Sequence, residues 1–154
     1  MEKKKPIKRH PALQPLSRQH HFGLLFSWKI RKGFSKNIET ERLKAYANWF
    51  YEQEIEPHFR DEEEYLFPIL EEGNELVERA LKEHRRIKRL FHNSDDSEKS
   101  LHQLEEELDA HIRFEERILF NEIQKVATEA QLAKIEEIHS SLNKHPEYSD
   151  PFWE

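Results

Sequence analysis

Apolar residues recur at helical spacing over most of the chain, and turn signals divide them into four long stretches. The stretches cover about residues 13–34, 39–71, 75–91 and 97–126. Each one places apolar side chains three or four positions apart, the spacing that puts them on one face of a helix. The pattern therefore predicts four long amphipathic helices.

The residues between these stretches favour the same boundaries. Gly33 stands where the first helix would stop, and Pro68 should bend the last turn of the second, because proline lacks the amide hydrogen that a helix uses. Asn74 is a good N-cap for the third helix. Either Asp96 or Ser97 can cap the fourth, after the loop NSDDS.

The predicted fold is all-α, an antiparallel up-down-up-down four-helix bundle, because short connections join neighbouring antiparallel helices. The bundle domain is expected over residues 13–142, including a short C-terminal helix from about residue 128. Residues 1–12 are expected to form a basic N-terminal tail, and residues 143–154 an irregular C-terminal tail.

Composition and charge limit the size of the domain and the kinds of partner that the chain can bind. The chain has 154 residues, enough for one domain with a real core, and three glycines, fewer than the turns of a sheet protein usually need. A formal net charge of −6 argues against nucleic acid as a partner, because phosphate-binding proteins need a basic surface. No apolar run is long enough to span a membrane, and no secretory signal follows the basic start. We expect no membrane contact and a cytoplasmic location. The sequence does not define an oligomeric state.

One motif is written twice. EIEPHFRDEEEYLFPIL, at residues 54–70, is echoed by ELDAHIRFEERILFNEI at residues 107–123. The echo pairs a histidine with a glutamate four positions later in both copies, and a Leu-Phe pair follows each: His58 with Glu62, and His111 with Glu115. Residues four apart on a helix point the same way. Both pairs lie on the predicted apolar face, where an unpaired carboxylate would cost several kcal/mol.

Single histidines occupy the same kind of position on the other two helices. In the third helix His84 lies on the apolar face near Ala80 and Ile87. The first helix offers both His20 and His21. His20 is in phase with the apolar face, whereas His21 lies about 100° further round the helix, so the phase favours His20 and leaves His21 as the alternative.

These inward residues suit a metal site. Imidazole and carboxylate donors without thiolate are typical ligands of iron, zinc or manganese, and the chain has no cysteine. Six donors exceed the four that a structural zinc takes. Two metal ions that share bridging carboxylates use six donors more naturally. The Glu-x-x-His spacing of ferritin-like bundles is different, so that pattern is not the match.

The paired H-x-x-x-E motif, with EH in the third helix and QHH in the first, resembles the hemerythrin-like, or HHE cation-binding, family. The stretch PLSRQHHFGLLFSWKIRKG is similar to the first helix of a bacterial branch of that family. The resemblance covers about residues 13–126. It implies a four-helix bundle around an oxo- or hydroxo-bridged non-heme di-iron centre. Carried onto this chain, it implies terminal His58 and His111, bridging Glu62 and Glu115, and His84 with one helix-one histidine.

The chain also departs from the oxygen-carrying hemerythrins. Their third helix supplies two histidines four residues apart, whereas Ala80 and Lys88 flank His84 at that spacing. Their fourth-helix carboxylate would correspond to Glu116, but helical phase and the parallel with Glu62 favour Glu115.

Three functions follow from these observations. The first is a di-iron protein that binds dioxygen or a related diatomic molecule in a sensing, storage or protective role. The alternatives are an oxidoreductase acting on peroxide or nitric oxide at the same centre, and a metal-free helical interaction module. An enzyme is the less favoured class, because no substrate-positioning constellation lies beside the ligands.

Overall fold

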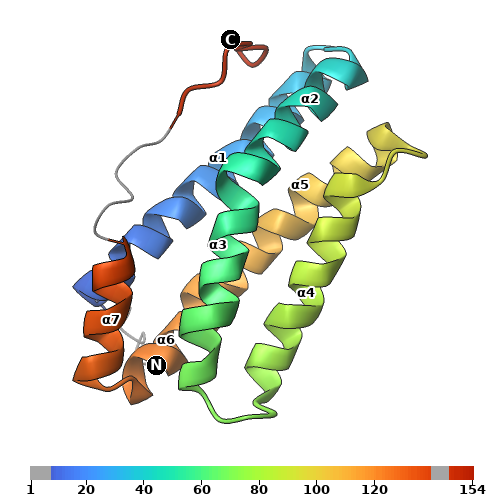
Figure 1. The fold of residues 1–154 in the computed structure, drawn as a ribbon. Helices are drawn as coiled ribbons and strands as arrows, with labels where there is room; N and C mark the ends of the chain where they lie inside the picture. The colour runs from blue at the N-terminus through green and yellow to red at the C-terminus, as the bar shows by residue number, and fades with distance from the viewer. Residues whose placement is uncertain (1–7, 140–145) are drawn as a thin grey trace, which may run out of the picture.

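A computed structural model describes residues 8–139 and 146–154 (Figure 1). Residues 1–7 and 140–145 lie outside the described residues; they include the start of the predicted N-terminal tail, the end of the predicted short C-terminal helix and the start of the predicted C-terminal tail. In chain order the elements are η1 (Pro11–Leu13), α1 (Gln14–Ser35), α2 (Thr40–Phe50), η2 (Tyr51–Ile55), α3 (Glu56–Asp61), η3 (Glu62–Leu66), η4 (Phe67–Ile69), α4 (Glu75–His92), α5 (Ser97–Phe114), η5 (Glu115–Leu119), α6 (Phe120–Val126) and α7 (Glu129–His139).

The expectation of an all-helical protein is confirmed for the described residues, which contain helices and no strand. Elements α2 to η4 follow one another without interruption and form one long helical segment, and α5, η5 and α6 form another. Together with α1 and α4, they give four long helical segments in the described part of the chain. The helix α1 continues through Gly33, which was expected to stop it, to Ser35. The turn before α4 lies where the sequence predicted: Gly73 adopts a left-handed φ of 81°, and the Asn74 side chain accepts hydrogen bonds from two backbone amides of α4. Asp96 caps α5.

A proline lies inside the second long segment, immediately before His58. Pro57 has no amide hydrogen, and its ring would crowd the carbonyl four residues earlier in a regular α-helix. The π-turn η2 precedes it and widens the helix, with the Glu56 amide donating to the Tyr51 carbonyl five residues back. The segment therefore passes the proline without ending. At its far end Pro68 lies in the 3-10 turn η4, after which the backbone becomes extended at Leu70.

Two apolar clusters fill the space between the segments. We call the first the aromatic core; it contains Phe26, Phe50, Phe59, Phe91, Leu104 and neighbouring residues. The second, the lower core, contains both Leu-Phe pairs of the repeated motif together with Leu16, Ala80 and Ile123. The segment α1 passes from the lower core to the aromatic core, α2 to η4 passes back, and α4 and α5 to α6 repeat the alternation. Consecutive segments therefore run in opposite directions.

Two glycines let α1 approach its neighbours closely. A Cβ atom at Gly23 would lie 2.5 Å from Ile112 Cδ1 of α5, and a Cβ atom at Gly33 would meet Leu43 of α2 and the ring of Phe152. Gly23 comes one turn after His20, so this close approach also brings His20 towards α5. The α1 helix makes its most extensive packing with α5.

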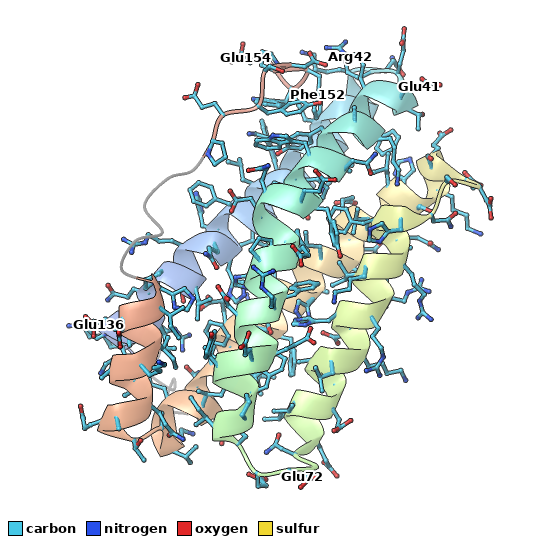
Figure 2. All side chains as sticks on the ribbon, viewed as in Figure 1. Glu41, Arg42, Glu72, Glu136, Phe152 and Glu154 are labelled. Carbon is cyan, nitrogen blue, oxygen red and sulfur yellow. The ribbon has the colours of Figure 1, made fainter. Side chains whose placement is uncertain are left out.

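The C-terminal residues 146–154 contain no helix or strand, yet they are docked against α1 and α2. Phe152 is buried beside Gly33, and the Asp150 carboxylate accepts two hydrogen bonds from Arg42 of α2 (Figure 2). At the other end of the molecule, α7 packs on the lower core, and its buried His139 contacts Asp61 of α3 at 3.3 Å. Among the described residues, no helix is long and apolar enough to cross a membrane.

Candidate metal centre

A layer of polar side chains separates the aromatic core from the lower core. Each long segment supplies part of it, and the relative exposure of every member is 5% or less. The layer, which we call the polar cluster, consists of His20 from α1, His58 and Glu62 from α3 and η3, His84 from α4, and His111 and Glu115 from α5 and η5. Burial of this many ionisable groups is costly unless they are paired with one another or with a cation.

Both glutamates begin a π-turn. The η3 turn starts at Glu62, whose carbonyl accepts from the Phe67 amide, and the η5 turn starts at Glu115, whose carbonyl accepts from the Phe120 amide. The two copies of the motif therefore share backbone geometry as well as residue types. Single π-turns inside α-helices occur frequently at functional sites. Each turn follows the His-Glu pair, so the pair itself keeps its common helix face.

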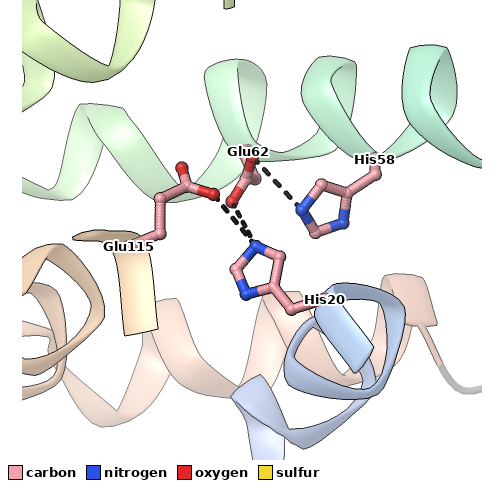
Figure 3. Close-up of side chains that lie close together, drawn as sticks. All are labelled: His20, His58, Glu62 and Glu115. Atoms are coloured by element: carbon pink, nitrogen blue, oxygen red, sulfur yellow. Dashed lines mark hydrogen bonds and ion pairs between the residues drawn. The ribbon is translucent and has the colours of Figure 1, made fainter. Parts of the chain in front are cut away.

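The donor atoms fall into two overlapping groups. In one group, His20, His58, Glu62 and Glu115 point toward one another, and one ligand atom from each lies within 4.8 Å of the others (Figure 3). In the other, Glu62 and Glu115 meet His84 and His111 within the same limit. Each carboxylate belongs to both groups, and each group has its own pair of imidazoles. This is the arrangement that two cations sharing two carboxylates require.

Buried polar atoms without a hydrogen bond indicate whether the polar cluster fits a metal ion. Among the described residues, eight buried side-chain atoms have no hydrogen-bond partner, and six of them belong to this cluster. These six are the Nε2 atoms of His58, His84 and His111, both carboxylate oxygens of Glu62, and Oε2 of Glu115. All six lie inside the cluster, where their nearest opposite charges are 3.2 to 3.7 Å away in ion-pair contacts. Such atoms are rare in folded proteins because each carries a desolvation cost, and coordination to metal ions would satisfy them together.

The opposite ring nitrogen of each imidazole is held from outside the cluster. Nδ1 of His58 lies 2.5 Å from the Gln19 amide oxygen, and the other three Nδ1 atoms lie 2.7 to 2.8 Å from carboxylate oxygens. The carboxylates are Glu116 for His20, Glu63 for His84 and Glu83 for His111. Each contact joins neighbouring segments, so the four contacts form a closed ring around the molecule. A protonated Nδ1 that donates outwards leaves Nε2 free to face a metal.

Two arginines extend this ring. Arg9 donates to Glu116, at 3.1 Å to Oε2 and 2.7 Å to its backbone carbonyl. Arg79 donates to Glu83 at 2.9 Å and stacks over the ring of Phe114. A guanidinium paired with a carboxylate keeps that carboxylate ionised and fixed in orientation.

The pKa values of the two central glutamates are lowered despite complete burial. Burial and the neighbouring charge of Glu115 oppose ionisation of Glu62, but His58 and His20 outweigh them and lower its pKa to about 2. Burial also opposes ionisation of Glu115, while His111, His20 and His84 hold its pKa well below the ordinary value. Both carboxyl groups are therefore anionic at neutral pH, which metal coordination requires.

Three histidines show the complementary shift. Burial lowers the pKa of His20 and His84, but hydrogen bonds to the surrounding glutamates raise both well above 6.5. The pKa of His111 is raised against burial by Glu115 and Glu83. Protons therefore neutralise the cluster when no metal is bound, and a metal ion must displace them.

A small cavity of about 10 Å³ adjoins one side of the polar cluster. This is room for about one water or a molecule of similar size. Its polar lining consists of Gln19, His20, Glu54, His58, His111 and Glu115, and its apolar lining includes Gly23, Phe50 and Leu108. His84 and Glu62 do not line it.

The structure brings together six of the seven predicted site residues and leaves one outside. His20 lies in the cluster, whereas His21 is exposed on the surface of α1. Glu115 lies at the centre, and Glu116 holds His20 from outside. Sequence reasoning missed the outer partners Gln19, Glu63 and Glu83. A signal for them exists, because each directly precedes or follows a cluster residue, as Glu116 also does.

The fold and this cluster define a class of protein, the helical cation-binding domains that hold metal with buried histidines and carboxylates. Residues 19–98 match the family model described as the hemerythrin HHE cation binding domain, which covers more than half of the chain. The protein therefore belongs to the hemerythrin HHE cation-binding family, as its motifs indicated. Membership implies a metal cofactor, usually iron. Curated proteins and solved structures gave no significant match to the chain.

Proposed function

We propose that this protein is a hemerythrin-type four-helix bundle that holds two iron ions in the polar cluster. Glu62 and Glu115 bridge the ions. His20 and His58 are terminal ligands at one position, and His84 and His111 at the other. The observation that carries the proposal is the set of six buried atoms without a hydrogen bond, all of which belong to two groups of possible ligands that share both carboxylates.

We further propose that the bound ligand is dioxygen or a related diatomic molecule. A pair of iron ions supplies exchangeable coordination positions and redox chemistry toward such molecules. The chain contributes a small cavity beside His20 and His58, about the size of one water, with apolar residues along one side. Sensing, storage and protection would each require such a site for a small ligand. The domain proposed for the function is residues 13–142, flanked by the two tails.

The alternatives make different demands on the structure. A metal-free interaction module would have to hold six buried polar atoms that make no hydrogen bond by ion pairing with protonated histidines alone, a cost that the chain could avoid with leucine at the same positions. An oxidoreductase acting on peroxide or nitric oxide would use the same centre, and only turnover distinguishes it. Metal analysis separates the first alternative, and a turnover assay separates the second.

The primary test is metal analysis of protein purified without chelator after iron-replete expression, together with an optical spectrum. We expect about two irons per chain and ferric charge-transfer bands that change when azide is added. The variant His21→Ala serves as a control with a histidine removed outside the cluster. Metal content near zero in the wild-type protein, or equal loss in His21→Ala and His20→Ala, would contradict the proposal. Peroxide consumption much faster than that of free iron would transfer support to the oxidoreductase.

A further inference from the structure

The ring of outer hydrogen bonds is uneven. Three of the four imidazoles are held by carboxylates, whereas His58 is held by the neutral amide of Gln19. A carboxylate acceptor makes an imidazole a more basic, stronger metal ligand than a neutral amide does. The neutral acceptor therefore occurs at one of the two proposed metal positions, the one formed by His20 and His58, whose rings lie 4.7 Å apart.

Charge around the two positions follows the same division. At the position of His84 and His111, two carboxylates accept from the rings, and Arg79 pairs with one of them. At the position of His20 and His58, one carboxylate accepts, and Arg9 pairs with it. The arginine contributions match, so the groups that accept from the imidazoles carry one negative charge fewer at the first position. Glu54 also lines the cavity there but is not among the acceptors of the ring hydrogen bonds. Lys88 helps to lower the pKa of Glu63, but no ion pair in the described part of the chain joins them.

Access differs in the same direction. The small cavity is lined by Gln19 and by both histidines of the His20 position. Of the two histidines at the other position, only His111 reaches it, and the ring of Phe59 stacks on His84 at 3.7 Å with an interplanar angle of 3°. An ion at the first position is therefore nearer to exchangeable water.

We propose that Gln19 makes the two metal positions unequal, so that the position of His84 and His111 fills first and the position of His20 and His58 binds its ion more weakly. The inference rests on the proposed two-metal centre. Gln19 acts as a positioning and tuning residue through His58. The weaker position, which adjoins the cavity, is then the one at which a small ligand binds and from which metal is lost first.

The test is an anaerobic titration of chelator-stripped full-length protein with Fe²⁺, followed by calorimetry. We expect two steps of one ion each, separated by at least about tenfold in affinity, since outer partners typically change metal affinity by about 10- to 100-fold. The step assignments come from two variants: His58→Ala should remove the weaker step, and His111→Ala the tighter one.

Substitutions of Gln19 test whether this residue sets the affinity of the weaker metal position. Gln19→Glu should tighten the weaker step by about 10-fold or more and leave the tighter step unchanged. Gln19→Met, of similar size but without an acceptor, should weaken the same step. A merely structural role would make both variants weaker. The matched control is Gln53→Glu, which adds the same charge at an exposed position and should change neither step.

The outcomes separate this inference from the function on which it rests. Two ions bound in a single step of equal affinity, or a weaker step that Gln19→Glu fails to tighten, would overturn the inequality and leave the two-metal centre intact. No Fe²⁺ binding by the wild-type protein would overturn the two-metal centre itself, and the inference with it.

Discussion

The aromatic core and the polar cluster are adjacent regions built on the same four helical segments, yet they reach stability in different ways. Rings in the aromatic core complete one another's packing, as where Phe26 stacks on Phe50 with centroids 4.6 Å apart. The polar cluster has the same degree of burial, but six of its atoms make no hydrogen bond and have only ion-pair contacts of 3.2 to 3.7 Å within the cluster. The first region is complete within the chain. The second needs either protons or metal ions to balance its charge.

The largest effect should come from emptying the polar cluster. Each metal ion present at about 1,000 times its Kd would add about 4 kcal/mol to the free energy of unfolding. Glu115→Ala removes a carboxylate shared by both groups, so metal analysis should find most of both ions lost and thermal unfolding should occur near the temperature of the chelator-treated wild type. Retention of two ions per chain in this variant would contradict the bridging role.

The aromatic core should respond to truncation whether or not metal is bound. Phe26→Ala creates a cavity among fully buried rings and should lower the free energy of unfolding by about 3 to 5 kcal/mol. Chemical denaturation of the metal-free and metal-loaded forms should give the same difference between variant and wild type. A difference that depends on metal would mean that the two regions are coupled, for example through Phe59 and His84.

Two glycines on one helix sharpen the comparison. Gly23→Ala forces Ile112 to move beside the polar cluster, and Gly33→Ala forces Leu43 and Phe152 to move near the C-terminal tail. Both should cost about 1 to 3 kcal/mol through overpacking. Only Gly23→Ala should also weaken metal binding, because it separates His20 from α5. Equal metal affinity in the two variants, measured by competition with a chelator, would argue against this role of the close approach.

The pH dependence should have opposite signs in the two forms. In metal-free protein the raised pKa values of His20, His84 and His111 stabilise the fold below pH 6.5, and this stability is lost as the pH rises through the folded values. Each histidine contributes up to about 1.4 kcal/mol per pH unit in that range. The pKa of Glu62, about 2, adds stability that is lost only in strong acid.

Metal binding reverses this slope because the ions displace those protons, so apparent metal affinity should increase with pH. Thermal unfolding of both forms from pH 6 to pH 9 gives the measurement. Parallel curves for the two forms would show that the histidine protons and the metal do not compete.

The smallest effect is expected at the surface. His21→Ala should change the free energy of unfolding by less than about 0.5 kcal/mol and leave the metal content unchanged, because the side chain is exposed and outside the cluster. His20→Ala, one position away, should lose metal. The pair measures how sharply helical phase separates a ligand from a surface residue.

Periodicity was sufficient to predict most of the helical organisation. The spacing of apolar residues and the capping signals at Asn74 and Asp96 act locally, so the sequence carries them directly. The π-turns were not predicted, because one extra residue changes an apolar pattern too little to be recognised. Pro57 could have indicated that the second segment departs from regular α-helix near His58.

The residues of the polar cluster were likewise available from the sequence, because polar side chains at buried positions of an amphipathic helix are conspicuous. Helical phase favoured His20 over His21 as the cluster residue of the first helix. The outer partners were not found, since Gln19, Glu63 and Glu83 act on imidazoles of other segments, and that pairing depends on how helices pack. Their adjacency to cluster residues marks them as candidates, but it does not tell which imidazole each one holds.

The π-turns at Glu62 and Glu115 have a consequence for anyone who would transplant this motif. A designer who copied His-x-x-x-Glu-x-x-x-Leu-Phe onto an ideal helix would place the histidine and glutamate correctly. The wider turn that follows each glutamate absorbs one residue, which corresponds to a rotation of about 100° in an α-helix. On the ideal scaffold the leucine, four positions after the glutamate, would still lie about 40° from it, but the phenylalanine would lie about 140° away and miss the interior. The graft would then hold its ligands beside an incompletely sealed core.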